Sequence, residues 1–303
     1  MRAPNPWEKL TLTSTMINGF VLVDKEPGFT SHDVVALARK KFQTKKIGHA
    51  GTLDPMATGL LVLGVGIGTK LINFIVEGKK SYEATIRLGA STTTDDKEGE
   101  VLEKKSVASI SESEIQTNLE KFKGRIKQVP SSVSAIKVDG KRAHERVRAG
   151  EEFQIPAREV EIFKLDVKNI KRIEEFIDID IEVQCSSGTY IRSIARDLGD
   201  NLKVGGHLIK LNRSEVAPFF LNEAKKLENS EIIPIKSGIE RVLPIRVLTP
   251  EEEREIFFGR PISKSIAEIV VGILPDGEYA AVLTNKDQGG ITLSFPSLVN
   301  VKE

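Results

Sequence analysis

Residues 48–59 combine one aspartate, one of the chain's four histidines and three glycines in the sequence GHAGTLDPMATG. Glycine allows positive φ and close backbone approach, and Pro55 restricts Asp54 to an extended backbone. The segment therefore predicts a tight loop that presents the Asp54 carboxylate and the His49 imidazole. A loop held this firmly around an ionisable group is typical of a functional site, although an Asp-Pro pair can also be an ordinary turn.

Two tyrosines and an arginine could complete such a site. Tyr82 opens an alternating segment, and Tyr190 and Arg192 open a helix. A carboxylate beside an arginine stays ionised and suits the role of nucleophile or base, and a tyrosine ring can stack on a nucleic-acid base. Each residue alone has a structural interpretation: Tyr82 as half-buried core, Arg192 as a surface helix residue and His49 as a loop hydrogen bonder. Only their occurrence together indicates a site.

Basic residues are concentrated in one part of the chain, although the net charge is only +1. Residues 121–148 hold nine lysines or arginines and two acids, whereas residues 95–120 hold eight acids and three lysines. Such segregation fits a local binding surface for a polyanion. Solvated helix faces produce the same pattern, and the charges alone do not decide between the two.

The remaining composition excludes several kinds of chemistry. Cys185 is the only cysteine, so neither an internal disulfide nor a thiolate metal site is possible, and a reducing cytoplasm is the expected compartment. No P-loop or His-Glu-x-x-His motif is present, and the glycines at 64, 66 and 68 lack dinucleotide-binding spacing. A glycosidase would need a second carboxylate beside Asp54, which the sequence does not identify. No apolar run approaches the ~18 residues of a membrane span.

Hydrophobic periodicity and capping residues predict the elements that position these groups. A strand at 20–23 precedes a helix capped at Thr30 or Ser31, and Tyr82, Ala84, Ile86 and Leu88 form one face of a strand. Further elements are expected at 60–71 (helix or strand), 111–122 (helix), 141–149 (helix), 178–185 (strand) and from 190 (helix), and two glycines at 205–206 break the chain before the segment 208–216. After a composition shift near 239–243, a helix capped by Thr249 and strands at 267–274, 279–284 and 291–294 predict a small β-rich appended domain.

Four ordered motifs between about Asn18 and Val216 resemble the bacterial TruB family of tRNA pseudouridine synthases. They are VDKEPG at 23–28, GHAGTLDP at 48–55, an arm at 128–150, and GTYIRSIARDLG at 188–199. The resemblance implies an α+β fold with a mixed, mostly antiparallel central sheet and flanking helices. The implied organisation is an N-terminal extension (1–15), a catalytic domain (16–240) with a basic thumb insertion (121–155), and a PUA-like RNA-binding domain (241–303).

The resemblance also implies roles for individual residues. Asp54 matches the catalytic aspartate, Tyr82 the residue that stacks on the flipped uridine, and Arg192 the partner of Asp54. His49, Tyr190 and Leu211 match positions that contact the flipped nucleotide or the surrounding RNA. The thumb residues expected at the RNA backbone are Lys137, Lys141, Arg142, Arg146 and Arg148.

The implied reaction converts a uridine in the tRNA T-loop, at position 55, to pseudouridine by base flipping and rearrangement of the glycosidic bond from nitrogen to carbon. The resemblance implies neither cofactor nor metal, and it implies a cytoplasmic monomer that binds the T-arm without a membrane. Ser131 and His144 depart from the family's arm pattern, where a proline and a tyrosine are usual. These departures put contacts between arm and RNA in question.

Three alternatives remain open at this point. The sequence does not decide whether Asp54 attacks C6 of the base or acts at the ribose. A tRNA-binding or tRNA-folding module would carry no chemistry at Asp54, and an RNA N-glycosylase would release free uracil. The start of the chain, at Met1 or Met16, and the role of residues 1–15 are also open.

Overall fold

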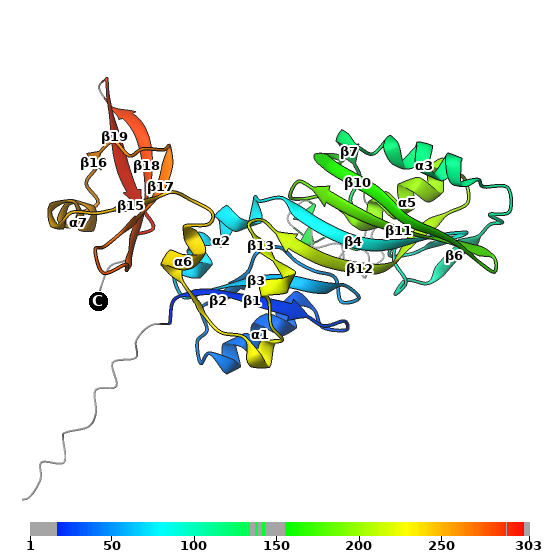
Figure 1. Cartoon of the computed structure of the whole chain (residues 1–303), viewed down its shortest axis with the longest axis horizontal. Helices are drawn as coiled ribbons and strands as arrows, with labels where there is room; N and C mark the ends of the chain where they lie inside the picture. The colour runs from blue at the N-terminus through cyan, green and yellow to red at the C-terminus, as the bar shows by residue number, and fades with distance from the viewer. Residues whose placement is uncertain are drawn as a thin grey trace, which may run out of the picture.

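The structure is a computed structural model that describes residues 17–299, apart from residues 132, 134–136, 139–140, 143–154 and 289. Its largest element is a ten-stranded sheet (Figure 1). Along the sheet the strands are β14 (Ile233–Pro234), β1 (Gly19–Lys25), β3 (Thr58–Val65), β12 (Gly206–Val216), β4 (Lys80–Leu88), β11 (Phe176–Cys185), β10 (Arg158–Ile173) and β7 (Gly124–Gln128), with β2 (Ile47–His49) beside β3 and β13 (Phe219–Phe220) beside β12. Only β3 and β12 pair in parallel among these strands. The expected mixed, mostly antiparallel α+β sheet is confirmed.

The N-terminal elements follow local sequence signals. Helix α1 (Ser31–Lys41) begins after Thr30, whose side chain accepts a hydrogen bond from Asp33 N at 3.0 Å. The ambiguous segment at 60–71 contains both structures, because β3 ends at Val65 and helix α2 (Gly68–Val76) follows. Gly66 makes the intervening turn at φ 58°, a conformation that glycine adopts without strain.

The strands around Tyr82 confirm the predicted alternation. Tyr82, Ala84, Ile86 and Leu88 are all buried on β4. Helices α3 (Glu112–Glu120) and α5 (Ile191–Asn201) cover this face, as expected from the periodicity. The long strand β10 was not predicted: a register shift after Ile162 interrupts its alternation, so the period-two signal is lost.

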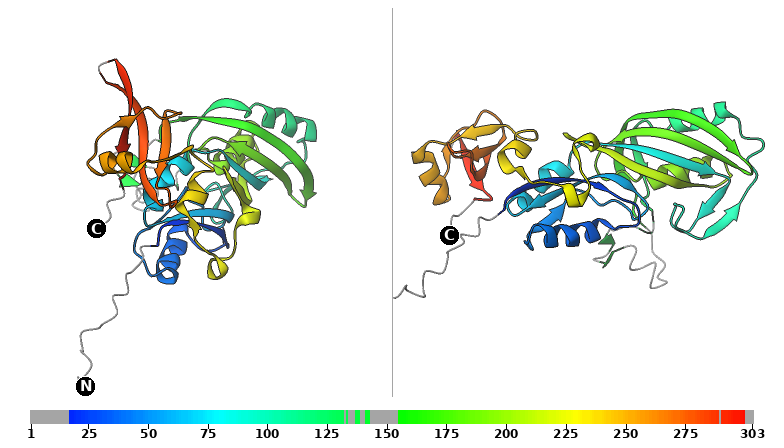
Figure 2. Two further views of the ribbon diagram at one scale, coloured as in Figure 1. Left: turned by 60° about the vertical axis from the view of Figure 1, so that its left-hand side comes forward. Right: turned by 60° about the horizontal axis from the view of Figure 1, so that its bottom comes forward.

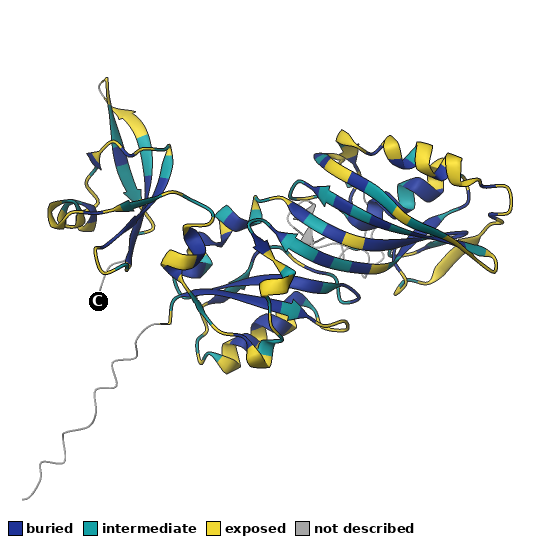
Figure 3. Cartoon of the chain, in the orientation of Figure 1, coloured by how far each residue is buried: buried dark blue, intermediate teal, exposed yellow. Residues whose placement is uncertain are grey.

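Two apolar cores lie on opposite faces of the sheet, and many residues of its strands are buried (Figure 3). Successive residues of β1 alternate between them: Val21 and Val23 join the first core, and Phe20 and Leu22 join the second. A strand buried on both faces has no polar side, which explains its continuous apolar sequence. The first core reaches Tyr82, so this residue is anchored in the packed interior of the sheet.

The C-terminal residues form a separate lobe, drawn in orange and red in Figure 2. Helix α7 (Pro250–Phe257) has the predicted Thr249 cap. A five-stranded sheet has the order β15 (Ile245–Val247), β17 (Ile269–Ile273), β18 (Tyr279–Gln288), β19 (Ile291–Ser297) and β16 (Ile262–Ser263). The three longer strands were expected, and the two short ones were not.

Helix α6 (Ile235–Ile239) joins this lobe to the main sheet, after the 3-10 turns η1 (Leu221–Glu223) and η2 (Leu227–Asn229). Val271 and Ile273 of the lobe share one apolar cluster with Ile235 and Ile239. No helix in the described ranges is long and apolar enough to cross a membrane.

The basic arm is described only in part. Strands β8 (Lys137–Val138) and β9 (Lys141–Arg142) pair antiparallel. The turn expected at 139–140 lies outside the described residues. A helix at Lys141 was therefore the wrong expectation, because Lys141 and Arg142 belong to a strand. The rest of that expected helix, with Arg146, Arg148 and His144, lies outside the described residues.

Candidate active site

The loop that carries Asp54 connects β2 to β3 and is held by the turn that follows β1. Gly28 N donates a hydrogen bond to Pro55 O at 2.8 Å. On the other side of the aspartate, Leu53 N donates to Ser31 Oγ at 2.8 Å. Both neighbours of Asp54 are thus fixed by a segment more than twenty residues earlier in the chain. The carboxylate is presented by a loop with tertiary support, which limits its motion.

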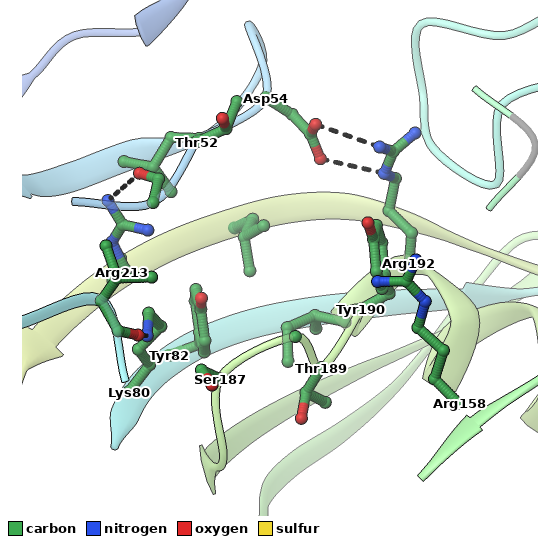
Figure 4. A pocket seen from close by; sticks show the side chains of 16 residues that line it. Thr52, Asp54, Lys80, Tyr82, Arg158, Ser187, Thr189, Tyr190, Arg192 and Arg213 are labelled. Carbon is green, nitrogen blue, oxygen red and sulfur yellow. Dashed lines mark hydrogen bonds and ion pairs between the residues drawn. The ribbon is translucent and has the colours of Figure 1, made fainter. Parts of the chain in front are cut away.

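Asp54 and Arg192 form a two-point ion pair (Figure 4). Arg192 Nε lies 2.9 Å from Asp54 Oδ2, and Nη2 donates to Oδ1 at 3.0 Å. The planar guanidinium matches a carboxylate in this geometry and fixes its orientation. Arg192 is only 5% exposed, so its interpretation as a surface helix residue was wrong.

A second carboxylate shares Arg192. Asp96 Oδ2 lies 3.4 Å from Arg192 Nη1, which also donates to Thr94 O at 3.0 Å. Asp96 belongs to the connection between strands β5 (Ala90–Thr92) and β6 (Val101–Lys104), and its side chain is buried. Arg192 therefore bridges two carboxylates, and its position depends on a hairpin about a hundred residues before it.

Ser131, one of the two departures from the family's arm pattern, also touches this network. Its hydroxyl accepts a hydrogen bond from Arg192 Nη1 at 3.5 Å and donates to Thr94 O at 3.2 Å. Ser131 is fully buried. The departure thus lies against the guanidinium that holds Asp54, and it concerns the site as well as the arm.

A cavity of about 480 Å³ opens beside the ion pair. Five of the residues singled out from the sequence line it, namely Asp54, Tyr82, Tyr190, Arg192 and Leu211. They come from the loop that carries Asp54, from β4, from the start of α5 and from β12, which are far apart in the sequence (Figure 4). The cavity has an aromatic side chain, an aliphatic side chain and a carboxylate facing one space, which fits a planar polar ligand.

The Tyr190 backbone is held by Gln128. Its N donates to Gln128 Oε1 at 2.8 Å, and Gln128 Nε2 donates back to Tyr190 O at 3.1 Å. No side chain caps α5 at Tyr190, and the Gln128 amide fixes the N-cap residue through its own N–H and C=O. The strand that enters the thumb therefore positions the helix that carries Arg192.

His49 does not belong to the wall of this cavity. It ends β2, and its ring meets His32 edge-on with centroids 5.4 Å apart. Its Nδ1 is buried without a hydrogen-bond partner among the described residues. Burial, followed by repulsion from His32, lowers the pKa of His49 to about 4, so the ring is neutral near pH 7.

The ionisable groups of the cavity have shifted pKa values. Burial raises the pKa of Asp54, and attraction to Arg192 opposes that rise. Burial also raises the pKa of Tyr82 to about 12 and lowers that of Lys80 to about 8. Perturbed groups that share a cavity are a physical sign of a functional site.

Three charged residues of the site were missed by the sequence analysis: Asp96, Lys80 and Arg213. Asp96 lies in the acidic stretch that was interpreted only as a counterweight to the basic arm. Lys80 and Arg213 line the cavity although both are buried. A signal existed for Lys80, because it shares the apolar face of β4 with Tyr82.

Solved structures with the same arrangement of elements support the fold. The structure superposes on the Cbf5-Nop10-Gar1 complex with a TM-score of 0.66 at 22% identity, covering 92% of this chain and 84% of the other. An archaeal box H/ACA Nop10-Cbf5 complex gives the same TM-score at 20% identity, with coverage of 96% and 89%. At this identity the likeness shows a shared fold.

Sequence comparison identifies the family. The pattern described as "TruB family pseudouridylate synthase (N terminal domain)" matches residues 39–191. The tRNA pseudouridine synthase B of Corynebacterium diphtheriae is 49% identical over 90% of this chain and 93% of its own. That of Thermobifida fusca is 46% identical, with coverage of 89% and 96%. The matched segment carries the loop with Asp54, Tyr82 and the start of α5, and the chain therefore belongs to the TruB family of pseudouridylate synthases.

Proposed function

We propose that the chain isomerises the uridine at position 55 in the T-loop of tRNA to pseudouridine, with Asp54 as the catalytic residue. The observation that carries the proposal is the Asp54 carboxylate, paired with Arg192 at the wall of a cavity lined by Tyr82 and Leu211. Relatives that are nearly half identical over most of the chain are named tRNA pseudouridine synthases, which supports the same reaction class and a tRNA substrate.

The uridine must leave its stacked loop before it can react, because its glycosidic bond is inaccessible there. Extrusion costs a few kcal/mol, and stacking on an aromatic ring recovers about 1–3 kcal/mol. Tyr82 is assigned this stacking role, and Leu211 and Tyr190 are assigned to contacts with the flipped nucleotide or the surrounding RNA. His49 is assigned to RNA outside the cavity, as a neutral hydrogen-bonding ring.

The reaction conserves every atom of the uridine. The bond between N1 and C1′ breaks, the base turns, C5 bonds to C1′, C5 loses its proton and N1 gains one. Asp54 either adds to C6 of the base or acts at the ribose, and both routes need it ionised. Arg192 favours that ionised form.

A nucleoside assay on unmodified tRNA tests the function against its rivals. Pseudouridine at position 55, with tritium released from C5 of the uridine, supports the proposal. Free uracil without pseudouridine would instead identify an N-glycosylase. Tight tRNA binding with neither product would identify a binding or folding module.

The thumb is proposed to hold the RNA backbone through Lys137, Lys141, Arg142, Arg146 and Arg148. Replacing Lys137, Lys141 and Arg142 together by glutamine should raise KM and flatten its dependence on salt, because three phosphate contacts are lost. The value of kcat should change much less, since these residues do not act on the uridine. Steady-state kinetics between low and moderate salt measure both effects. An unchanged salt slope removes the thumb from the RNA interface.

The lobe from about residue 241 is proposed to be a PUA-like RNA-binding domain of a monomeric enzyme. Residues 244–303 hold six basic and nine acidic residues. The net charge of this domain is negative, so we expect its contribution to RNA binding to come mainly from shape rather than from phosphate attraction.

Deleting residues 244–303 should therefore weaken tRNA binding while leaving the salt slope nearly unchanged and the chemistry intact at saturating tRNA. Filter binding and single-turnover kinetics measure the two effects. Because Ile235 and Ile239 lose apolar cover, a thermal melt of the truncated protein is the necessary control. Complete loss of turnover in a folded truncated protein would mean that the lobe is integral to catalysis.

A further inference from the structure

Two buried cations lie against the cavity and take no part in the ion pair of Asp54. Lys80 is 6% exposed and Arg213 is 1% exposed, yet both line the cavity. Lys80 Nζ donates to Val76 O at 2.6 Å and Gly78 O at 3.0 Å. Arg213 Nε donates to Leu60 O at 2.8 Å, and its Nη2 donates to Gly51 O at 3.1 Å.

Neither charge is neutralised by a carboxylate within ion-pair distance in the described part of the chain. Their partners are neutral carbonyl oxygens, and Arg213 also interacts with the Tyr82 hydroxyl. An ammonium has three donors and a guanidinium has five, so both groups keep donors for a further acceptor. Uncompensated buried charge destabilises a fold, and it persists where function uses it.

Both cations converge on the place assigned to the base. Arg213 is the register partner of Tyr82 across β12 and β4, and Lys80 precedes Tyr82 by two residues on the same face. A methyl group on Gly51 would lie 3.5 Å from Arg213 Nη1 and 3.6 Å from Lys80 Cε. The two side chains therefore meet beneath the catalytic loop, beside the stacking tyrosine.

Burial decides which part of the substrate they can meet. Phosphates remain at the outside of the RNA, where exposed Arg158 stands at the cavity wall. A flipped base is the part of the RNA that enters the cavity. Lys80 and Arg213 are thus placed for the oxygen atoms of uracil.

We propose that Lys80 and Arg213 form an electrostatic site that stabilises the negative charge of uracil during its detachment. The proposal rests on the proposed function. When the bond between N1 and C1′ breaks, its electron pair stays with the base and spreads over N1, O2 and O4, while Asp54 compensates the electron-poor ribose. Fixed cations in a dry cavity lower the energy of such a state without reorganising. An electron pair at C5 of the base then forms the new bond to C1′, and the negative charge of the base disappears.

Replacing Lys80 by methionine keeps the length of the side chain and removes the charge. Lys80→Met should lower the single-turnover rate at saturating enzyme by about 10²-fold, with an unchanged Kd for tRNA. Lys80→Arg, which retains the charge, should recover most of that rate. The matched control is Lys25→Met: Lys25 is equally buried and bonds carbonyls at 2.7 and 2.9 Å, yet it does not line the cavity. Any fall in the rate of Lys25→Met should come from a displaced loop around Asp54. It should therefore be accompanied by a lower melting temperature.

The pH dependence of kcat/KM tests the charge of Lys80 directly, because a purely structural role of Lys80 would not change it. Burial, followed by repulsion from Arg213 and opposed by Cys185, lowers the pKa of Lys80 to about 8. We expect kcat/KM to fall above about pH 8 in the natural protein and the fall to disappear in Lys80→Arg, because a guanidinium keeps its proton. Lys25 has a pKa of about 8 as well, and Lys25→Arg should leave the alkaline fall in place.

The outcomes separate this proposal from the function on which it rests. If the natural protein makes no pseudouridine, the function itself fails. If it does, and Lys80→Met reacts at the natural rate, only the cation site is overturned. Lys80→Met could instead bind tRNA more weakly, with the slope of log K against log salt concentration reduced by about one. That result would make Lys80 a phosphate contact and would also overturn the proposal. Should Lys80→Met not fold, an alkaline fall that persists in Lys80→Arg overturns the proposal equally.

Discussion

Asp54→Asn should abolish pseudouridine formation while tRNA binding survives. The amide has nearly the shape of the carboxylate, but it is neither a nucleophile nor a base. We expect the single-turnover rate to fall by at least about 10³-fold, since catalytic groups of this kind contribute about 10²–10⁴-fold even as simple bases. Nucleoside analysis of tRNA after incubation, beside filter binding of the same tRNA, makes the measurement. Modification at the natural rate would remove Asp54 from the chemistry.

The same substitution should leave the free energy of unfolding unchanged or raise it. Burial raises the pKa of Asp54, so the folded state holds a proton at this site at a higher pH than the unfolded state does. A group whose pKa is raised by folding stabilises the folded state at low pH. That stabilisation is lost as the pH rises through the pKa of the folded state. Asparagine carries no such dependence. Urea unfolding at pH 7 should therefore show Asp54→Asn to be at least as stable as the natural protein, the pattern of a residue kept for function.

Arg192→Met should damage both activity and stability. Its removal leaves Asp54 and Asp96 without their shared cation, and breaking a buried pair costs about 3–5 kcal/mol. The pKa of Asp54 should then rise further, because the attraction that opposed burial is gone. At neutral pH less of the carboxylate is ionised, so the rate should fall strongly and recover in part as the pH is raised.

Two measurements check this second prediction. The acid limb of the pH–rate profile should move to higher pH in Arg192→Met. The loss of unfolding free energy should be larger at pH 8 than at pH 5, since at pH 5 the unpaired Asp54 carboxylate is more nearly protonated. Arg196→Met is the matched control, because Arg196 lies one turn later on α5 and pairs with Asp95 and Asp197 at 3.2 and 2.7 Å. Arg196→Met should lower the free energy of unfolding and leave the acid limb of the pH–rate profile where it is in the natural protein. A shifted acid limb in Arg196→Met would contradict the prediction that Arg192 in particular keeps Asp54 ionised.

Much of the fold could be predicted from the sequence because its signals are local. Alternation on β4, the Thr30 and Thr249 caps and the mixed sheet implied by the motifs are all confirmed. Strand β10 escaped because its register shift breaks the alternation that identifies a strand. Arg192 taken alone could not be distinguished from a surface helix residue for a related reason: helical periodicity reports the apolar face, and it cannot report an arginine buried by partners from another segment.

The sequence by itself determined the family and the tight loop around Asp54. Glycine permits positive φ and proline restricts the residue before it, both through their own covalent structure, so this loop can be predicted before any contact is known. Only the tertiary structure decided which charges meet that loop. It joined Asp54 to Arg192 and Asp96, placed Lys80 and Arg213 beneath the loop, and left His49 outside the cavity. Burial and pairing depend on segments that are distant in the sequence, and these long-range contacts set the pKa values on which the chemistry depends.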